Sequence, residues 1–268
     1  MKMFEVIGER INTSRQNVQN AVVQKDAQYI IDDVMKQQEA GAAYIDVNAG
    51  ARIGHETEDM QWLINTIQPI VTVPLCLDSP DPQVLEMAFE MMDTTPMINS
   101  ISLEKDRFDA MIPFLKGKEC KVIALCMDDS GMPGSSDAVI SRADTLVKEL
   151  NAIGIKTGSI YIDPLVQPIS TDSDKGVMVL NAVRGIKTKY PDVHITCGLS
   201  NISYGLPQRK IINRTFLTLM MDAGTDSAII DPLDEKIMAA IQTADMLLGN
   251  DEYCGDFLTG VRAGAIKS

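Results

Sequence analysis

Short apolar runs recur along the chain, and each gives way to a polar residue or a turn. Eight such runs are visible, at 4–7, 44–48, 73–79, 97–100, 122–127, 159–164, 194–198 and 228–232. Runs this short and rich in branched residues are typical of strands covered on both faces. The run at 73–79 ends on Asp78, a carboxylate that is costly to bury unpaired, so we expect Asp78 at the exit of the strand, facing a cleft.

Helical periodicity fills the intervals between these runs. Ile30, Ile31, Val34 and Met35 recur at helical spacing ahead of Gly41, and a second stripe carries Met60, Leu63, Ile64 and Ile67. The expected helix starts are Asp26, Asp81 followed by Pro82, Asp137 and Asp234, each suited to cap a first turn. The chain therefore alternates strand and helix.

Eight strand–helix units in 268 residues match the size and pattern of a (β/α)8 TIM barrel. A doubly wound sheet is the competing α/β architecture, but neither a G-x-G-x-x-G fingerprint nor a P-loop is present. No long stretch rich in Pro, Gly or Ser divides the chain. We expect residues 1–268 to form a single domain.

The charge balance restricts the partners of this protein. The formal net charge is −13, from 24 Lys and Arg against 37 Asp and Glu, which disfavours nucleic acid as a partner. No apolar run approaches the roughly 18 residues of a membrane span, and the N-terminus does not resemble a signal peptide. We expect a cytoplasmic protein with no membrane association.

Cysteine and histidine usage argues against several kinds of catalytic site. The five cysteines form no C-x-x-C pair, and the histidines are only His55 and His194. A zinc site would need such residues clustered, and a Ser-His-Asp triad would need a histidine at a strand exit. We expect reduced cysteines packed as small apolar residues and no metal bound by this chain.

Polar residues gather at the expected strand exits, where the active site of such a barrel lies. They are Glu9, Asn12, Asp46, Asn48, Asp78, Asn99, Asp128, Asp163, Asn201 and Asp231. Carboxylates accept hydrogen bonds and carboxamides both donate and accept, so this mixture suits a flat, donor-rich heterocycle. A carboxylate cluster holding a hard cation is an alternative, and Asp163-Pro164 and Asp231-Pro232 also suit simple strand-ending turns.

Six segments, in order along nearly the whole chain, resemble the pterin-binding methyltransferases. They lie at 8–12 (GERIN), 75–79 (LCLDS), 97–100 (MINS), 161–165 (YIDPL), 198–201 (GLSN) and 212–217 (INRTFL). The likeness is strongest to the methyltetrahydrofolate:corrinoid protein methyltransferases of anaerobic bacteria. That resemblance implies a (β/α)8 barrel, usually a homodimer, which exchanges a methyl group between N5 of tetrahydrofolate and the cobalt of a corrinoid on a partner protein.

The resemblance also implies roles for individual residues. Asp78, Asn99 and Asp163 correspond to the groups that hold the pterin, and Asn201 to a catalytic residue near N5. A tertiary amine leaves poorly, so a hydrogen bond to N5 that strengthens in the transition state would speed transfer. The supporting residues would be Glu9, Asn12, Asp46, Asn48 and Asp128, while Arg52, Gln208 and Arg209 are candidates to bind the carboxylates of the folate tail.

Some alternatives stay open at this point. Dihydropteroate synthase shares the pterin barrel, although its Ser-Arg-Lys segment is replaced here by Leu199-Ser200-Asn201. A non-catalytic folate-binding protein would also keep the pterin residues. The sequence does not choose between transfer from methyltetrahydrofolate, as in acetyl-CoA synthesis, and transfer to tetrahydrofolate, as after O-demethylation of methylated compounds.

Overall fold

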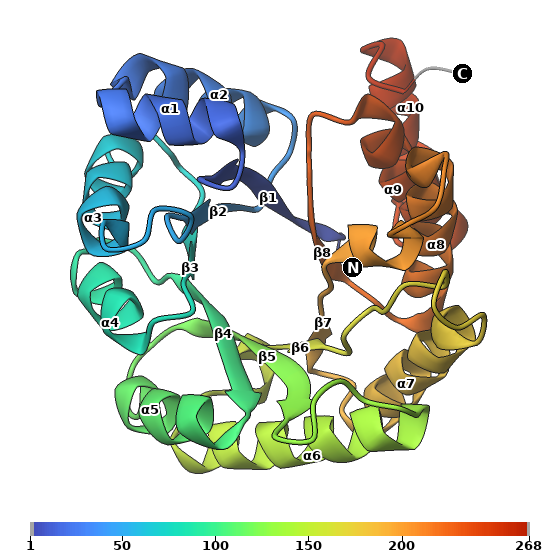
Figure 1. The fold of residues 1–268 in the computed structure, drawn as a ribbon. Coiled ribbons are helices and arrows are strands. Elements are labelled where there is room, and N and C mark those ends of the chain that lie inside the picture. The colour runs from blue at the N-terminus through green and yellow to red at the C-terminus, as the bar shows by residue number, and fades with distance from the viewer. Residues whose placement is uncertain (1–2, 267–268) are drawn as a thin grey trace.

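The computed structural model describes residues 3–266 and shows a ring of parallel strands enclosed by helices (Figure 1). The strands are β1 (Glu5–Asn12), β2 (Tyr44–Asn48), β3 (Leu75–Asp78), β4 (Met97–Leu103), β5 (Lys121–Asp128), β6 (Ile160–Asp163), β7 (His194–Ile195) and β8 (Ser227–Ile230). The order of hydrogen-bonded neighbours is β7-β6-β5-β4-β3-β2-β1-β8. The predicted (β/α)8 barrel is confirmed.

Helices follow the strands around the outside of the ring. They are α1 (Gln16–Gln24), α2 (Ala27–Glu39), α3 (Glu56–Ile67), α4 (Pro82–Glu90), α5 (Lys105–Leu115), α6 (Ser136–Ala152), α7 (Lys175–Lys189), α8 (Arg209–Ala223), α9 (Glu235–Leu247) and α10 (Gly255–Arg262), with short 3-10 turns η1 (Thr157–Ser159), η2 (Leu199–Ser203) and η3 (Glu252–Cys254). Among residues 3–266, none of the helices combines the length and apolar character needed to cross a bilayer.

The seam between β7 and β8 is held by a few contacts in place of a continuous ladder. A single bridge joins Gly198 to Ile229. The backbone N–H of Ile195 donates to Asp226 Oδ1 at 2.8 Å, and Ser227 Oγ donates to the carbonyl of Ile195 at 3.0 Å. Strand β7 has only two residues because the chain turns into η2 just after Gly198, so the barrel is nearly but not fully closed by backbone pairing.

Two expectations about helices need correction. Helix α1 was not predicted: it buries only Val18, Ala21 and Val22 among polar residues, so its apolar stripe is narrow. The cap of α6 is Ser135, not Asp137. Ser135 is extended and its side chain accepts from the N–H of Ala138 at 3.2 Å, whereas Asp137 already lies in the first turn, where its charge suits the helix dipole.

Successive side chains along each strand point alternately to the helices and to the barrel interior, so the core has two parts. One set of buried side chains packs against the helices, and a separate interior cluster contains Ile7, Tyr44, Cys76, Met97, Ile123 and Tyr161. At the N-terminal ends of the strands, Lys121 Nζ donates to Tyr161 Oη at 3.0 Å and also contacts Tyr44 Oη, while Tyr161 Oη donates to Glu5 Oε2 at 2.5 Å. This network fills the bottom of the barrel.

Gly8 in β1 leaves room for a buried polar side chain from α2. A Cβ at Gly8 would lie 2.3 Å from Gln37 Oε1. Gln37 is fully buried and donates to Asp33 Oδ1 at 3.0 Å, and Arg10 forks onto Asp33 at 2.9 Å from Nε and 2.7 Å from Nη2. This chain of contacts docks α2 onto the first strand.

We expect Gly8→Ala to lower the free energy of unfolding by about 1–3 kcal/mol, because the added methyl group forces Gln37 out of place. Urea denaturation measures this change. Gly134→Ala is the matched control, since a Cβ there meets no atom within 4 Å. Equal unfolding free energies for the two variants would contradict this account.

Candidate functional site

Polar side chains form the top interior layer of the barrel, at the C-terminal ends of its strands. Neighbouring strands pair Asn48 with Asp78 and Asp78 with Asn99, and Asp163 pairs with Leu125 across β6 and β5. A cavity of about 430 Å³ opens beside Asp78, Asn99 and Leu125. Asp78 and Asn99 therefore line one cavity, and Asp163 lies beside Leu125, which borders that cavity.

A neighbouring amide orients the carboxylate of Asp78. Asn48 Nδ2 donates to Asp78 Oδ2 at 2.8 Å, and Asn48 Oδ1 accepts from the N–H of Gly50 at 3.0 Å, which fixes the direction of the amide. Burial raises the pKa of Asp78, while the Asn48 hydrogen bond and the positive charge of Arg107 oppose that rise. Asn48 thus holds the carboxylate of Asp78 in place.

Asp46 lies one layer below this mouth and is 2% exposed. It accepts hydrogen bonds from Asn99 Nδ2 at 3.4 Å and from the thiol of Cys76. Burial and the nearby charge of Asp78 raise the pKa of Asp46 well above its ordinary value. Asp46 supports Asn99 from beneath.

Asp163 ends β6 and is buried, with its carboxylate accepting backbone hydrogen bonds. The N–H of Leu165 donates to Asp163 Oδ1 at 2.8 Å, and Gly198 supplies a second backbone N–H. Burial nevertheless raises the pKa of Asp163 to about 6. Asp163 therefore does organise an Asp-Pro turn, and it also presents a buried carboxyl group at the strand end.

Asn201 occupies a different setting from the other candidates. It lies in η2, directly after the seam at β7, and its side chain is exposed. Its Nδ2 lies 3.3 Å from the position that a Cβ on Gly198 would take, so Gly198 allows the turn to fold closely. An exposed amide on a short turn at the mouth is accessible to a ligand.

The basic residues proposed for the folate tail already have protein partners. Arg52 Nη1 donates to both carboxylate oxygens of Asp59 at 2.7 Å, and Asp59 is fully buried. Arg209 donates to Ser203 Oγ at 3.0 Å and to the carbonyl of Ser200 at 2.7 Å, so it holds η2 together. Gln208 is exposed in the left-handed conformation ahead of α8.

The other strand-end candidates mainly organise their own loops. Asn12 Oδ1 accepts from the N–H of Ser14 at 2.9 Å. Asp128 binds Arg142 at 2.7 Å, and its hydrogen bonds lower its pKa. Glu9 is largely buried, and that burial raises its pKa.

Asp231 forms the strand-ending turn that its Asp-Pro sequence suggested, and it also makes ion pairs that the sequence did not indicate. It forms ion pairs with Arg10 at 2.9 Å and with Arg15 at 3.4 Å. Its Oδ1 also accepts from the N–H of Leu233 at 3.0 Å. The residue therefore ties the end of β8 to the first strand and its following helix.

One contributor to the mouth, Arg107 on α5, was not predicted. Its guanidinium borders the same cavity as Asp78 and Asn99 and donates to the backbone carbonyls of Ser79, just after β3, and of Ser100, within β4. Its position within a polar helical stretch gives no signal in the sequence, because its partners are backbone carbonyls of other segments.

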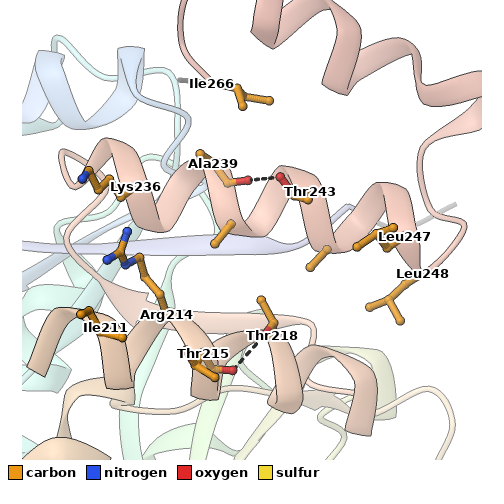
Figure 2. A pocket seen from close by; sticks show the side chains of 12 residues that line it. Ile211, Arg214, Thr215, Thr218, Lys236, Ala239, Thr243, Leu247, Leu248 and Ile266 are labelled. Atoms are coloured by element: carbon orange, nitrogen blue, oxygen red, sulfur yellow. Dashed lines mark hydrogen bonds between the residues drawn. The ribbon is translucent and has the colours of Figure 1, made fainter. Parts of the chain in front are cut away.

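A larger groove lies outside the barrel, between α8 and α9 (Figure 2). Its volume is about 590 Å³, and small side chains such as Thr215, Thr218, Ala239 and Thr243 line it. It contains no strand-end carboxylate. Within residues 3–266, no group of three or more His, Cys, Asp or Glu residues is arranged to hold a metal ion. The candidate site is therefore the smaller, polar mouth.

Comparison with known proteins identifies the family of the chain. The profile of the family described as pterin binding enzyme matches residues 8–231. The chain belongs to the pterin-binding enzyme family. It is 37% identical over 263 residues to the methylcorrinoid:tetrahydrofolate methyltransferase of Eubacterium limosum, with 97% of each chain covered.

More distant matches, one in sequence and one in structure, are consistent with this family. The chain is 30% identical to a 238-residue region of the methionine synthase of Mycobacterium tuberculosis, which covers 84% of this chain but only 20% of that enzyme. A dihydropteroate synthase of Coxiella burnetii in complex with pteroic acid superimposes with a TM-score of 0.67 at 15% identity, covering 92% of this chain and 95% of that one. At that identity the structural likeness shows only the shared fold.

We expect the carboxyl group of Asp163 to titrate near pH 6 in the free protein. Because its folded pKa lies above the unfolded value, ionisation at neutral pH costs stability, and this cost disappears as the pH falls through 6. Wild type should therefore gain stability relative to Asp163→Asn between pH 7 and pH 5, as urea denaturation would show. A pH-independent difference between the two proteins would contradict the raised pKa.

Proposed function

We propose that this protein transfers a methyl group between the cobalt of a corrinoid, carried by a separate protein, and N5 of tetrahydrofolate. The observation that carries the proposal is the full-length relationship to the methylcorrinoid:tetrahydrofolate methyltransferase of Eubacterium limosum. The composition of the mouth supports it, because a pterin needs several hydrogen-bond acceptors and donors in one plane.

In this proposal, three strand ends hold the pterin. Asp78 and Asp163 accept from its N–H and amino groups, and Asn99 pairs with an edge that both donates and accepts. Asn48 keeps Asp78 in place, and Asp46 holds the amide of Asn99 from below. Buried carboxylates without a full set of donors gain hydrogen bonds when such a ligand binds, which favours its binding.

Asn201 acts on the reacting nitrogen. In transfer from methyltetrahydrofolate, the bond from N5 to carbon breaks as the cobalt–carbon bond forms. N5 keeps the electron pair and gains a proton, while cobalt(I) supplies the attacking pair and becomes cobalt(III). A side-chain N–H of Asn201 directed at N5 would stabilise the charge that develops there. In the opposite direction, the lone pair of neutral N5 attacks the methyl group on cobalt(III), the cobalt–carbon bond breaks with its electron pair left on cobalt(I), and N5 releases its proton to solvent.

The nucleophile in this scheme comes from the partner, so the protein needs no reactive side chain of its own. That requirement agrees with the burial of Cys76, Cys126 and Cys197 and with their raised thiol pKa values, which burial causes. The protein's task is to hold the folate and to leave N5 open to the corrinoid protein.

The folate tail leaves the mouth near η2 in this proposal. Gln208 and Arg209 lie beside the turn that carries Asn201, and Arg209 can bind a carboxylate without leaving Ser200 because its guanidinium has several N–H groups. Arg52 can reach the tail only by loosening its bond to Asp59. We further propose a cytoplasmic homodimer with no metal of its own.

A spectroscopic assay tests the activity. The protein is mixed with tetrahydrofolate and candidate methylcorrinoid proteins, and absorbance follows the methyl–cobalt species. Loss of that species with one partner would establish both the transfer and the pathway. Tight folate binding with no transfer to or from any partner would favour a folate-binding protein instead.

We expect Asn201→Ala to slow methyl transfer by about 100-fold, the usual scale for losing one transition-state donor, while the Kd for tetrahydrofolate changes little. Single-turnover kinetics and isothermal titration calorimetry measure the two quantities. Asn99→Ala is the comparison, because it should weaken binding. Equal losses of rate and affinity in Asn201→Ala would rule out the role assigned to Asn201.

A further inference from the structure

Arg107 connects the segment that follows β3 to the middle of the neighbouring strand β4. From α5, its Nη2 donates to the carbonyl of Ser79 at 3.0 Å and its Nη1 to that of Pro80 at 2.5 Å. Its Nε donates to the carbonyl of Ser100 at 3.0 Å, and Nη2 reaches the same oxygen at 2.5 Å. One guanidinium thus binds three backbone carbonyls.

The bound carbonyls belong to the residues that directly follow the proposed pterin groups. Ser79 and Pro80 come after Asp78 at the end of β3, and Ser100 comes after Asn99 in β4. The N–H of Ser79 also donates to the carbonyl of Asn99, at 3.3 Å. Any shift of Ser79, Pro80 or Ser100 therefore changes the spacing between Asp78 and Asn99.

The charge of Arg107 also acts on Asp78. The two side chains border one cavity, and the guanidinium lowers the pKa of Asp78 against the effect of burial. Several acidic groups lie nearby. The charge of Glu56 raises the pKa of Asp78, and the charge of Asp78 raises the pKa of Asp46. Asp81 and Glu104 raise the pKa of Arg107. Arg107 is the cation that faces this acidic group of side chains.

We propose that Arg107 is a positioning residue for pterin binding, which joins the loop after β3 to Ser100 of β4 and thereby sets the spacing of Asp78 and Asn99 and the charge state of Asp78. This inference rests on the proposed function. An arginine suits this task because its planar fork spreads donors on three nitrogens over three separate carbonyls, whereas a lysine concentrates its donors and charge on a single nitrogen.

Arg142 on α6 provides a matched comparison. It donates to the carbonyls of Cys126 at 3.1 Å and Gly131 at 2.8 Å, and to Asp128 at 2.7 Å, so it fastens the loop after β5 in the same manner. It does not border the cavity beside Asp78. Loss of Arg142 should affect its own loop without changing the spacing of Asp78 and Asn99.

The test measures the Kd for tetrahydrofolate by isothermal titration calorimetry from pH 5 to pH 8 in Arg107→Gln, Arg107→Lys and Arg142→Gln, with urea denaturation of each. Arg107→Gln should bind at least tenfold more weakly at pH 7. Its affinity should also begin to fall at a higher pH than in wild type, because Asp78 loses its neighbouring cation. Arg107→Lys should restore the pH profile but not the affinity.

Arg142→Gln should lose stability and keep the wild-type Kd. Arg107 variants that bind within twofold of wild type with an unchanged pH profile would overturn the inference, as would an equal loss of affinity in Arg142→Gln. If Arg107→Gln does not fold, the Kd of Arg107→Lys for tetrahydrofolate decides the test alone. If wild type transfers the methyl group and the Arg107 variants keep the wild-type Kd, only this inference is refuted. If wild type does not bind tetrahydrofolate, the proposed function is refuted as well.

Discussion

The structure depends on the side-chain alternation of a parallel sheet that curves into a nearly closed barrel. In each strand every second residue faces the axis, so the interior fills in layers supplied by different strands. Glu5, Tyr44, Lys121 and Tyr161 meet at the bottom, and Ile7, Cys76, Met97 and Ile123 in the middle. Above them, Asp78 and Asp163 end β3 and β6, and Asn99 lies within β4 in register with Asp78.

This arrangement places carboxyl groups in a poorly solvated space. Burial raises the pKa of Asp46, Asp78 and Asp163, and only Asp78 has a guanidinium among the main influences on its pKa. Such carboxyl groups gain hydrogen bonds when a ligand brings N–H donors. Shifted pKa values of this kind often accompany functional sites. The bottom of the barrel differs, because Lys121 and Glu5 there meet the hydroxyl groups of the two tyrosines.

The sequence was sufficient for the barrel and for the residues at its strand ends. Asp78 and Asp163 were predictable as strand ends because each closes an apolar run. The fourth strand was expected at 97–100 but continues to Leu103, so Asn99 lies within β4 and not at its end. Helix α1 was missed since its apolar stripe is narrow, and Asp137 was taken for the cap that Ser135 provides.

Contacts between distant segments were beyond sequence reasoning. Arg52 seemed available for a ligand, yet it is bound to Asp59. The sequence suggested a turn at Asp231 but not its ion pairs with Arg10 and Arg15. Arg107 was not identified at all, because backbone carbonyls leave no trace in the pattern of side chains. Periodicity locates a side chain on an element, whereas its partners depend on how the elements pack.

A crystal structure of the protein with bound methyltetrahydrofolate would test the central claim most directly. We expect the pterin ring in the mouth of the barrel, with hydrogen bonds to Asp78, Asn99 and Asp163, Asn201 beside N5, and the methyl group open to solvent. A pterin bound elsewhere, or a metal ion held by those side chains in its place, would contradict the account.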